Sequence, residues 1–160
     1  MLLQSNLPDL QPRAHVLVRT GLGALRAHYL WDTRQVEDGF HELTAVAYEG
    51  SHVLTQSRIA LPVVVRNLAL QANLIMPATS ELRSAGAPML VQVTANTNGV
   101  AAIRLFSTGG MVGSATNQAS AKFTVAGGSL GAGLHPFYAV VETRDEQRYR
   151  TQTRFVRLTP

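Results

Sequence analysis

Apolar and polar residues alternate in short runs along most of this chain, and turn residues separate the runs. Alternation with a period of two is typical of a β-strand that buries one face. The first half shows such runs at residues 14–20, 41–48 and 53–66, and residues 25–31 could form a strand or one helical turn, of which we favour the strand. The second half shows them at residues 69–76, 88–95, 101–107, 111–115, 119–125, 134–142 and 147–158. No convincing 3.6-residue periodicity extends beyond three turns, so the pattern predicts an all-β protein.

The spacing of these runs predicts two unequal units. The second half holds seven predicted strands with turn signals every 8–12 residues, which is typical of a β-sandwich. The first half holds only four or five strands before residue 67, too few for a complete sandwich. We expect an arm at residues 1–13, an incomplete sandwich at 14–68 and a second sandwich at 69–160. Upstream sequence, the arm or another chain would supply the missing strands, the last by β-strand addition.

One motif occurs twice, at positions 94 residues apart. The pattern Gly-x-His-x-(Leu/Phe)-x-Ala-Val begins at Gly39 and again at Gly133. A repeat of this length is too long for a solenoid unit and matches one β-sandwich domain. It therefore supports two tandem modules of the same kind.

The repeat also places His41 and His135 at equivalent positions. These histidines could bind a ligand or act in catalysis, or each could hydrogen-bond the backbone of a neighbouring connection at a sheet corner. Recurrence in both modules favours the corner, because an active site rarely duplicates together with its scaffold. We expect a structural corner made of Gly39, His41, Gly133, His135 and Trp31.

Residues 29–48 (YLWDTRQVEDGFHELTAVAY) resemble bacterial immunoglobulin-like repeat domains. In those domains a Trp-Asp-Thr run closes one strand, and a His-x-Leu-x-Ala-x-Ala-Tyr/Phe segment forms the penultimate strand. The match covers residues 26–67 well and residues 70–160 more loosely. The resemblance implies two tandem immunoglobulin-like (fibronectin III-like) sandwiches, the first incomplete. It also implies an extracellular or cell-envelope location in a large exported bacterial protein, as spacer, adhesion or binding modules.

Basic residues gather in the second half of the chain. The net charge is +4, and residues 70–160 carry all of it. Five arginines lie close together in sequence: Arg144, Arg148, Arg150, Arg154 and Arg157. Such a strip could bind a polyanion. Solvated positions on an edge hairpin explain it better, because Glu142, Asp145 and Glu146 lie among the arginines.

Other candidate chemistry is sparse. The remaining histidines, which lack metal-ligand spacing, are His15, His28 and His52. A calcium-accepting loop could form from Asp32, Glu37 and Asp38, but their spacing favours ordinary surface acids. The chain has no cysteine, which excludes disulfides and thiolate chemistry, and it has no phosphate-binding loop or nucleophile elbow. We therefore predict no enzyme, no metal and no cofactor.

The predicted function is that of non-enzymatic structural or interaction modules of the spacer or adhesion type. The partners would be other domains of the same larger chain or like subunits. One alternative is a self-assembling extracellular filament or surface-layer subunit completed by strand addition between chains. Another is a polyanion- or carbohydrate-binding module. No apolar run approaches the ~20 residues that span a bilayer, so we expect no membrane span.

Overall fold

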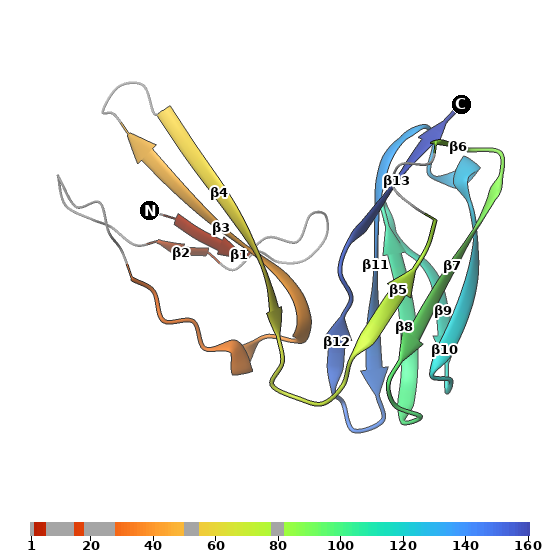
Figure 1. Ribbon diagram of the computed structural model, residues 1–160, viewed down its shortest axis with the longest axis horizontal. Helices are drawn as coiled ribbons and strands as arrows, with labels where there is room; N and C mark the ends of the chain where they lie inside the picture. The colour runs from red at the N-terminus through yellow and green to blue at the C-terminus, as the bar shows by residue number, and fades with distance from the viewer. Residues whose placement is uncertain (1, 6–14, 18–27, 50–54, 78–81) are drawn as a thin grey trace.

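The computed structural model describes residues 2–5, 15–17, 28–49, 55–77 and 82–160 (Figure 1). These residues form β-strands joined by turns and two short 3₁₀ helices, and no α-helix occurs among them. The all-β prediction is confirmed. In the same described ranges, no helix is long and apolar enough to cross a membrane.

The second unit is a closed sandwich of two sheets (Figure 1). One sheet has the order β10–β7–β5, and the facing layer contains β9, β8, β11 and β13. Their bounds are β5 Ala72–Ile75, β6 Leu82–Ser84, β7 Pro88–Ala95, β8 Val100–Ser107, β9 Gly110–Thr116, β10 Ser120–Ala126, η2 Gly127–Ser129, β11 Gly133–Thr143, β12 Arg148–Arg150 and β13 Arg154–Thr159. In an immunoglobulin-like sandwich, strands A, B and E of one sheet face strands C, F and G of the other. Here β5, β7 and β10 take the places of A, B and E, and β8, β11 and β13 take the places of C, F and G.

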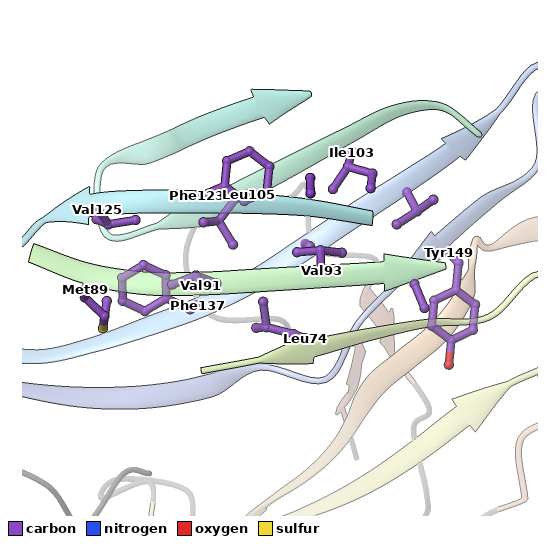
Figure 2. Close-up of a cluster of buried hydrophobic side chains, with 14 of the residues drawn as sticks. Leu74, Met89, Val91, Val93, Ile103, Leu105, Phe123, Val125, Phe137 and Tyr149 are labelled. Carbon is purple, nitrogen blue, oxygen red and sulfur yellow. The ribbon is translucent and has the colours of Figure 1, made fainter. Parts of the chain in front are cut away.

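The two sheets enclose one apolar core (Figure 2). Alternate residues of β7 point inward, so that Met89, Val91 and Val93 are at most 1% exposed. Phe137 of β11 belongs to the same cluster and is fully buried. Burying each such side chain stabilises the fold by about 1.5–3 kcal/mol, which makes this cluster the main source of stability.

The first unit is a single sheet with the order β2–β1–β3–β4 (Figure 1). Its elements are β1 Leu2–Ser5, β2 His15–Leu17, η1 Thr33–Gln35, β3 Asp38–Glu49 and β4 Thr55–Val65. The hairpin of β3 and β4 runs in regular antiparallel register from Gly39 opposite Val65 to Glu49 opposite Thr55. Within the described residues, no second sheet packs on this layer.

The two units repeat one arrangement at a fixed spacing of 94 residues. The turns η1 and η2 begin 94 residues apart, and each precedes a long strand that carries a corner histidine. Strands β1 and β4 flank β3 as β8 and β13 flank β11. Strand β2 extends that sheet beyond β1 as β9 does beyond β8. The described part of the first unit therefore has counterparts of β8, β9, β11 and β13 but none of β5 and β7.

A short parallel ladder joins the two units. Tyr149 and Arg150 of β12 lie beside Asp38 and Gly39 of β3. The sheet of the first unit and the larger sheet of the second unit are thereby hydrogen-bonded to each other.

The strand predicted at residues 25–31 is not formed in the part that is described. Residues 28–31 have no strand assignment, and Tyr29 is 45% exposed. The counterpart in the second unit is β10, which pairs with β7. The physical reason is that the described residues offer the first unit no strand equivalent to β7. Residues 25–27 lie outside the described ranges.

The arm predicted at residues 1–13 begins as a strand instead. Leu2–Ser5 pairs with β3 over four residues. The segment was not predicted as a strand, because its residues do not alternate between apolar and polar. Residues 6–13 lie outside the described ranges, as do residues 50–52, which separate the runs predicted at 41–48 and 53–66.

Two further strand predictions need correction. Pro62 lies inside the run predicted at 53–66, where a proline favours a bulge or a switch of sheets because it cannot donate to a ladder. Strand β4 instead passes through Pro62 in regular register opposite Glu42. Proline is tolerated there because β4 is an edge strand, whose outer side needs no donor. The closing strand predicted at 147–158 divides into β12 and β13. At the break, Thr151 exchanges hydrogen bonds with the backbone of Ala139, donating from its N–H and accepting at Oγ1, both at 2.9 Å.

Candidate interaction surface and corner residues

Both corner histidines donate a hydrogen bond to the carbonyl oxygen four residues earlier. His41 Nε2 lies 2.8 Å from Glu37 O, and His135 Nε2 lies 3.0 Å from Gly131 O. A carbonyl oxygen only accepts, so Nε2 carries the proton in each ring. Both side chains are about 5% exposed or less, on strands of different units. The two rings hold two separate connections, and they do not share a cleft.

Further contacts fix these rings. The Thr108 hydroxyl lies 3.2 Å from His135 Nδ1, so both ring nitrogens of His135 are engaged within the protein. The ring of Trp31 packs edge-on against His41, with the ring centroids 5.7 Å apart. Trp31 thus lies over the first corner as a packing residue.

The two corner glycines adopt positive φ angles, +113° at Gly39 and +140° at Gly133. This backbone region favours glycine. Gly39 has a second constraint, because a Cβ atom there would overlap the carbonyl oxygen of Arg150. The first corner glycine is therefore also the contact point of the ladder between β3 and β12.

Two of the three acids considered for calcium binding, Asp32 and Asp38, already have structural roles. Asp38 is 3% exposed, and its carboxylate accepts hydrogen bonds from the backbone N–H groups of Asn67 at 2.9 Å and Leu68 at 2.6 Å. Asp32 pairs with Arg34 at 2.9 Å, which lowers the pKa of the Asp32 carboxyl. Among the described residues, no three His, Cys, Asp or Glu side chains gather as metal ligands would.

The remaining histidines do not join either corner. His28 is exposed in the irregular segment before η1. His15 lies in β2, and His52 lies outside the described residues.

The structure disperses the five arginines. Arg150 is fully buried, with its guanidinium stacked 3.4 Å from the ring centre of Tyr138. Arg144 extends from a loop towards Asn117 Oδ1 at 3.5 Å. Arg154 and Arg157 are exposed on β13.

Arg148, the fifth arginine, belongs to an ion cluster. Its guanidinium lies 3.1 Å from the Glu142 carboxylate, and Arg104 of β8 lies 2.7 Å from the other oxygen of that carboxylate. Arg104 first, and Arg148 second, hold the pKa of the Glu142 carboxyl below its ordinary value. Sequence reasoning did not identify Arg104, because it lies 38 residues from Glu142.

A hollow of about 330 Å³ lies where the linker meets two loops of the second unit. Its polar side chains are engaged locally. Asn96 binds the backbone of Gln71 and Ala69, and the Asp145 carboxylate accepts from Gln147 at 2.7 Å. Hydrogen bonding, chiefly from the Thr143 hydroxyl, lowers the pKa of Asp145. The polar side chains that line the hollow are therefore mostly engaged in hydrogen bonds within the protein.

A broad apolar face lies open on the first unit. Ile59 and Leu61 of β4 are 70% and 59% exposed, and they pair with Ala45 and Leu43 of β3. Alternation along the strands puts these four side chains on one face. We name them, with Val63, the open face. Large contiguous apolar patches are uncommon on soluble monomers, which makes the open face a candidate contact site.

The second unit shows what the open face would be if covered. Leu43 and Ala45 correspond to Phe137 and Ala139, whose side chains lie in the core and are 0% exposed to solvent. Val63, opposite His41, corresponds to Val156, opposite His135 and also 0% exposed. The same face is core in one unit and surface in the other.

The chain was compared with protein families, curated proteins and solved structures. No protein-family model matches the chain, and no curated protein matches it. Among solved structures, the chain is similar to fibronectin(III)-like modules of CbhA from Clostridium thermocellum. The identity is 20% and the TM-score 0.46, over 55% of this chain and 94% of that chain. The likeness is one of architecture.

Proposed function

We propose that this chain is a non-enzymatic structural and interaction unit of an exported bacterial protein. Its closed sandwich and its open sheet would hold attached parts of a larger assembly at a fixed spacing. The observation that carries this proposal is the junction, where β12 pairs with β3 and the Asp38 carboxylate fixes the linker at Asn67 and Leu68. A flexible tether would have no such contacts.

The site chemistry supports the same role. The corner histidines, the junction acid and the most buried arginine each hold a backbone segment or stack on a ring. Catalytic groups need a free functional atom directed at a substrate, and these side chains direct theirs into the fold.

The proposed location and partners follow from the sequence resemblance to exported immunoglobulin-like repeats. The location would be extracellular or in the cell envelope, and the partners would be neighbouring domains or like subunits. A polyanion-binding role has less support, because Arg150 is buried and Arg148 is paired with Glu142.

A distance measurement tests the spacer role. The chain has no cysteine, so Ser57→Cys on β4 and Thr124→Cys on β10 introduce two unique attachment points for spin labels, both exposed. We expect one narrow distance distribution between the two units. Thr124→Cys with Arg157→Cys, both within the second unit, gives the reference width. A distribution several-fold broader than that reference would contradict a rigid spacer.

A further inference from the structure

We propose that two β-strands from outside residues 1–160, equivalent to β5 and β7, complete the first unit by covering its open face. The inference rests on the proposed interaction role and names the partner class: an extended segment whose alternate side chains are apolar. The argument uses the internal repeat, since the second unit shows what covers the equivalent positions.

The order of elements defines what is missing. In the second unit the chain passes through β8, β9, β10, η2, β11 and β13, and the first unit follows the same order with β1, β2, residues 28–32, η1, β3 and β4. The strands that precede this series in the second unit are β5 and β7, which form the covering sheet with β10. Their absence from the described first unit leaves a sandwich with one layer.

Residues 28–32 keep the pattern of the strand they would form. They correspond to residues 122–126 of β10, where Phe123 and Val125 point into the core. Tyr29 and Trp31 occupy those two positions in the first unit. Trp31 already contacts His41, on the side of the open face. A strand equivalent to β7 would pair with this segment.

The side chains of the open face determine which kind of strand can cover it. In the second unit Met89, Val91 and Val93 of β7 belong to the cluster that buries Phe137 and Val156. The open face offers the same kind of contact, because its five side chains are apolar and uncharged. An occupant with a charge at an inward position would lose its hydration without gaining a partner. The fitting occupant therefore alternates like β7.

The occupant comes from outside residues 1–160 for a structural reason. Strands β5 and β7 of this chain are held in its own closed sandwich, and β1 pairs with β3. A second copy in this conformation would have the same strands engaged. Addition to the outer edge of β4 is also disfavoured, because Pro62 lies within that edge and cannot donate to a ladder.

A peptide titration tests the proposal. The probe is a synthetic peptide of residues 86–97, which contains β7 and has no tryptophan or tyrosine. Trp31 is the single tryptophan of the chain, so its fluorescence reports on residues 28–32. We expect a saturable blue shift when the peptide is added to the full chain. Replacing Met89, Val91 and Val93 by serine in the peptide should weaken binding at least tenfold.

Matched variants locate the binding surface. Leu61→Asp places a charge on the open face at a side chain that is 59% exposed, and it should weaken peptide binding at least tenfold. Val64→Asp changes a residue of the same strand that points to the opposite face and is 50% exposed, and it should change the affinity less than twofold. Circular dichroism checks that each variant keeps the wild-type fold.

A fusion protein tests the same contact if the free peptide binds too weakly to be detected. Placing a second copy of residues 69–97 ahead of Met1 through a flexible linker raises the effective strand concentration to the millimolar range. An unchanged Trp31 spectrum in both formats would overturn the proposal. So would equal binding of the serine peptide, or a dimer of the chain alone that Leu61→Asp dissociates, since a second copy would then be the occupant. A narrow spin-label distribution without strand binding would leave the spacer role standing and reject only this inference.

Discussion

At the scale of single residues, Glu142 is the clearest electrostatic feature of the second unit. Its carboxylate bridges Arg104 and Arg148 across neighbouring strands, and Arg104 makes the shorter contact. Because this cluster lowers the folded-state pKa of Glu142, it stabilises the fold at pH values above the ordinary glutamate pKa and loses that effect as the pH falls through the lowered value.

We therefore expect Glu142→Gln to destabilise the protein at pH 7 by about 1 kcal/mol or less, since partly exposed ion pairs are weak. The difference from wild type should shrink below about pH 4, near and under the ordinary glutamate pKa. Urea denaturation at pH 7 and pH 3 measures both quantities. A double-mutant cycle with Arg104→Gln separates the pair from the general change in charge. A difference that is equal at both pH values would contradict the prediction.

Single residues also show the limits of sequence reasoning. The duplicated motif identified Gly39, His41 and their counterparts as positions that share one environment. Nothing local pointed to Asp38 as the group that holds the linker, because its donors lie 29 and 30 residues away. Contacts of this kind become visible only when distant segments are placed in space.

At the scale of elements, alternation predicted most strands of the second unit, because each has a partner that buries its inward side chains. Residues 28–31 belong to a segment that was predicted as a strand, and they form none. A strand prediction from sequence is therefore not sufficient, because a strand forms only where another strand is present to pair with it. The short strand β6, at Leu82–Ser84, was not predicted, because three residues are too few to show alternation. It forms through parallel pairing with β13.

A pair of equivalent substitutions tests this contrast. Phe137→Ala should lower the free energy of unfolding by about 3–5 kcal/mol, because it leaves a cavity in a closed core. Leu43→Ala, at the equivalent position of the open face, should cost less than about 1 kcal/mol, since its neighbours there remain in contact with water. Urea denaturation followed by circular dichroism compares them. Losses of similar size would show that the open face is already covered.

At the scale of the whole molecule, the junction depends on one position without a side chain. Gly39 combines a φ of +113° with direct contact to the backbone of Arg150. The duplicated motif predicted a corner at Gly39, whereas the parallel pairing of β12 with β3 could not be foreseen, because it joins strands that lie far apart in the sequence.

Gly39→Ala should therefore separate β3 from β12. We expect a loss of about 1–3 kcal/mol from backbone strain, with a further loss from the overlap with Arg150. The Ser57–Thr124 spin-label distribution should broaden. The control is Gly109→Ala, where φ is +87° and nothing lies within 4 Å of the added carbon. An unchanged distribution in Gly39→Ala would mean that the ladder does not set the geometry of the two units.

The constant spacing of the two corners has a practical consequence. Turn, glycine, histidine and strand recur 94 residues apart with no insertion between them. Residues 32–49 and 126–143 therefore have equal length and carry the same turn, glycine and histidine at the same positions. Exchanging one segment for the other would therefore keep the length of the chain and the position of the corner in each unit.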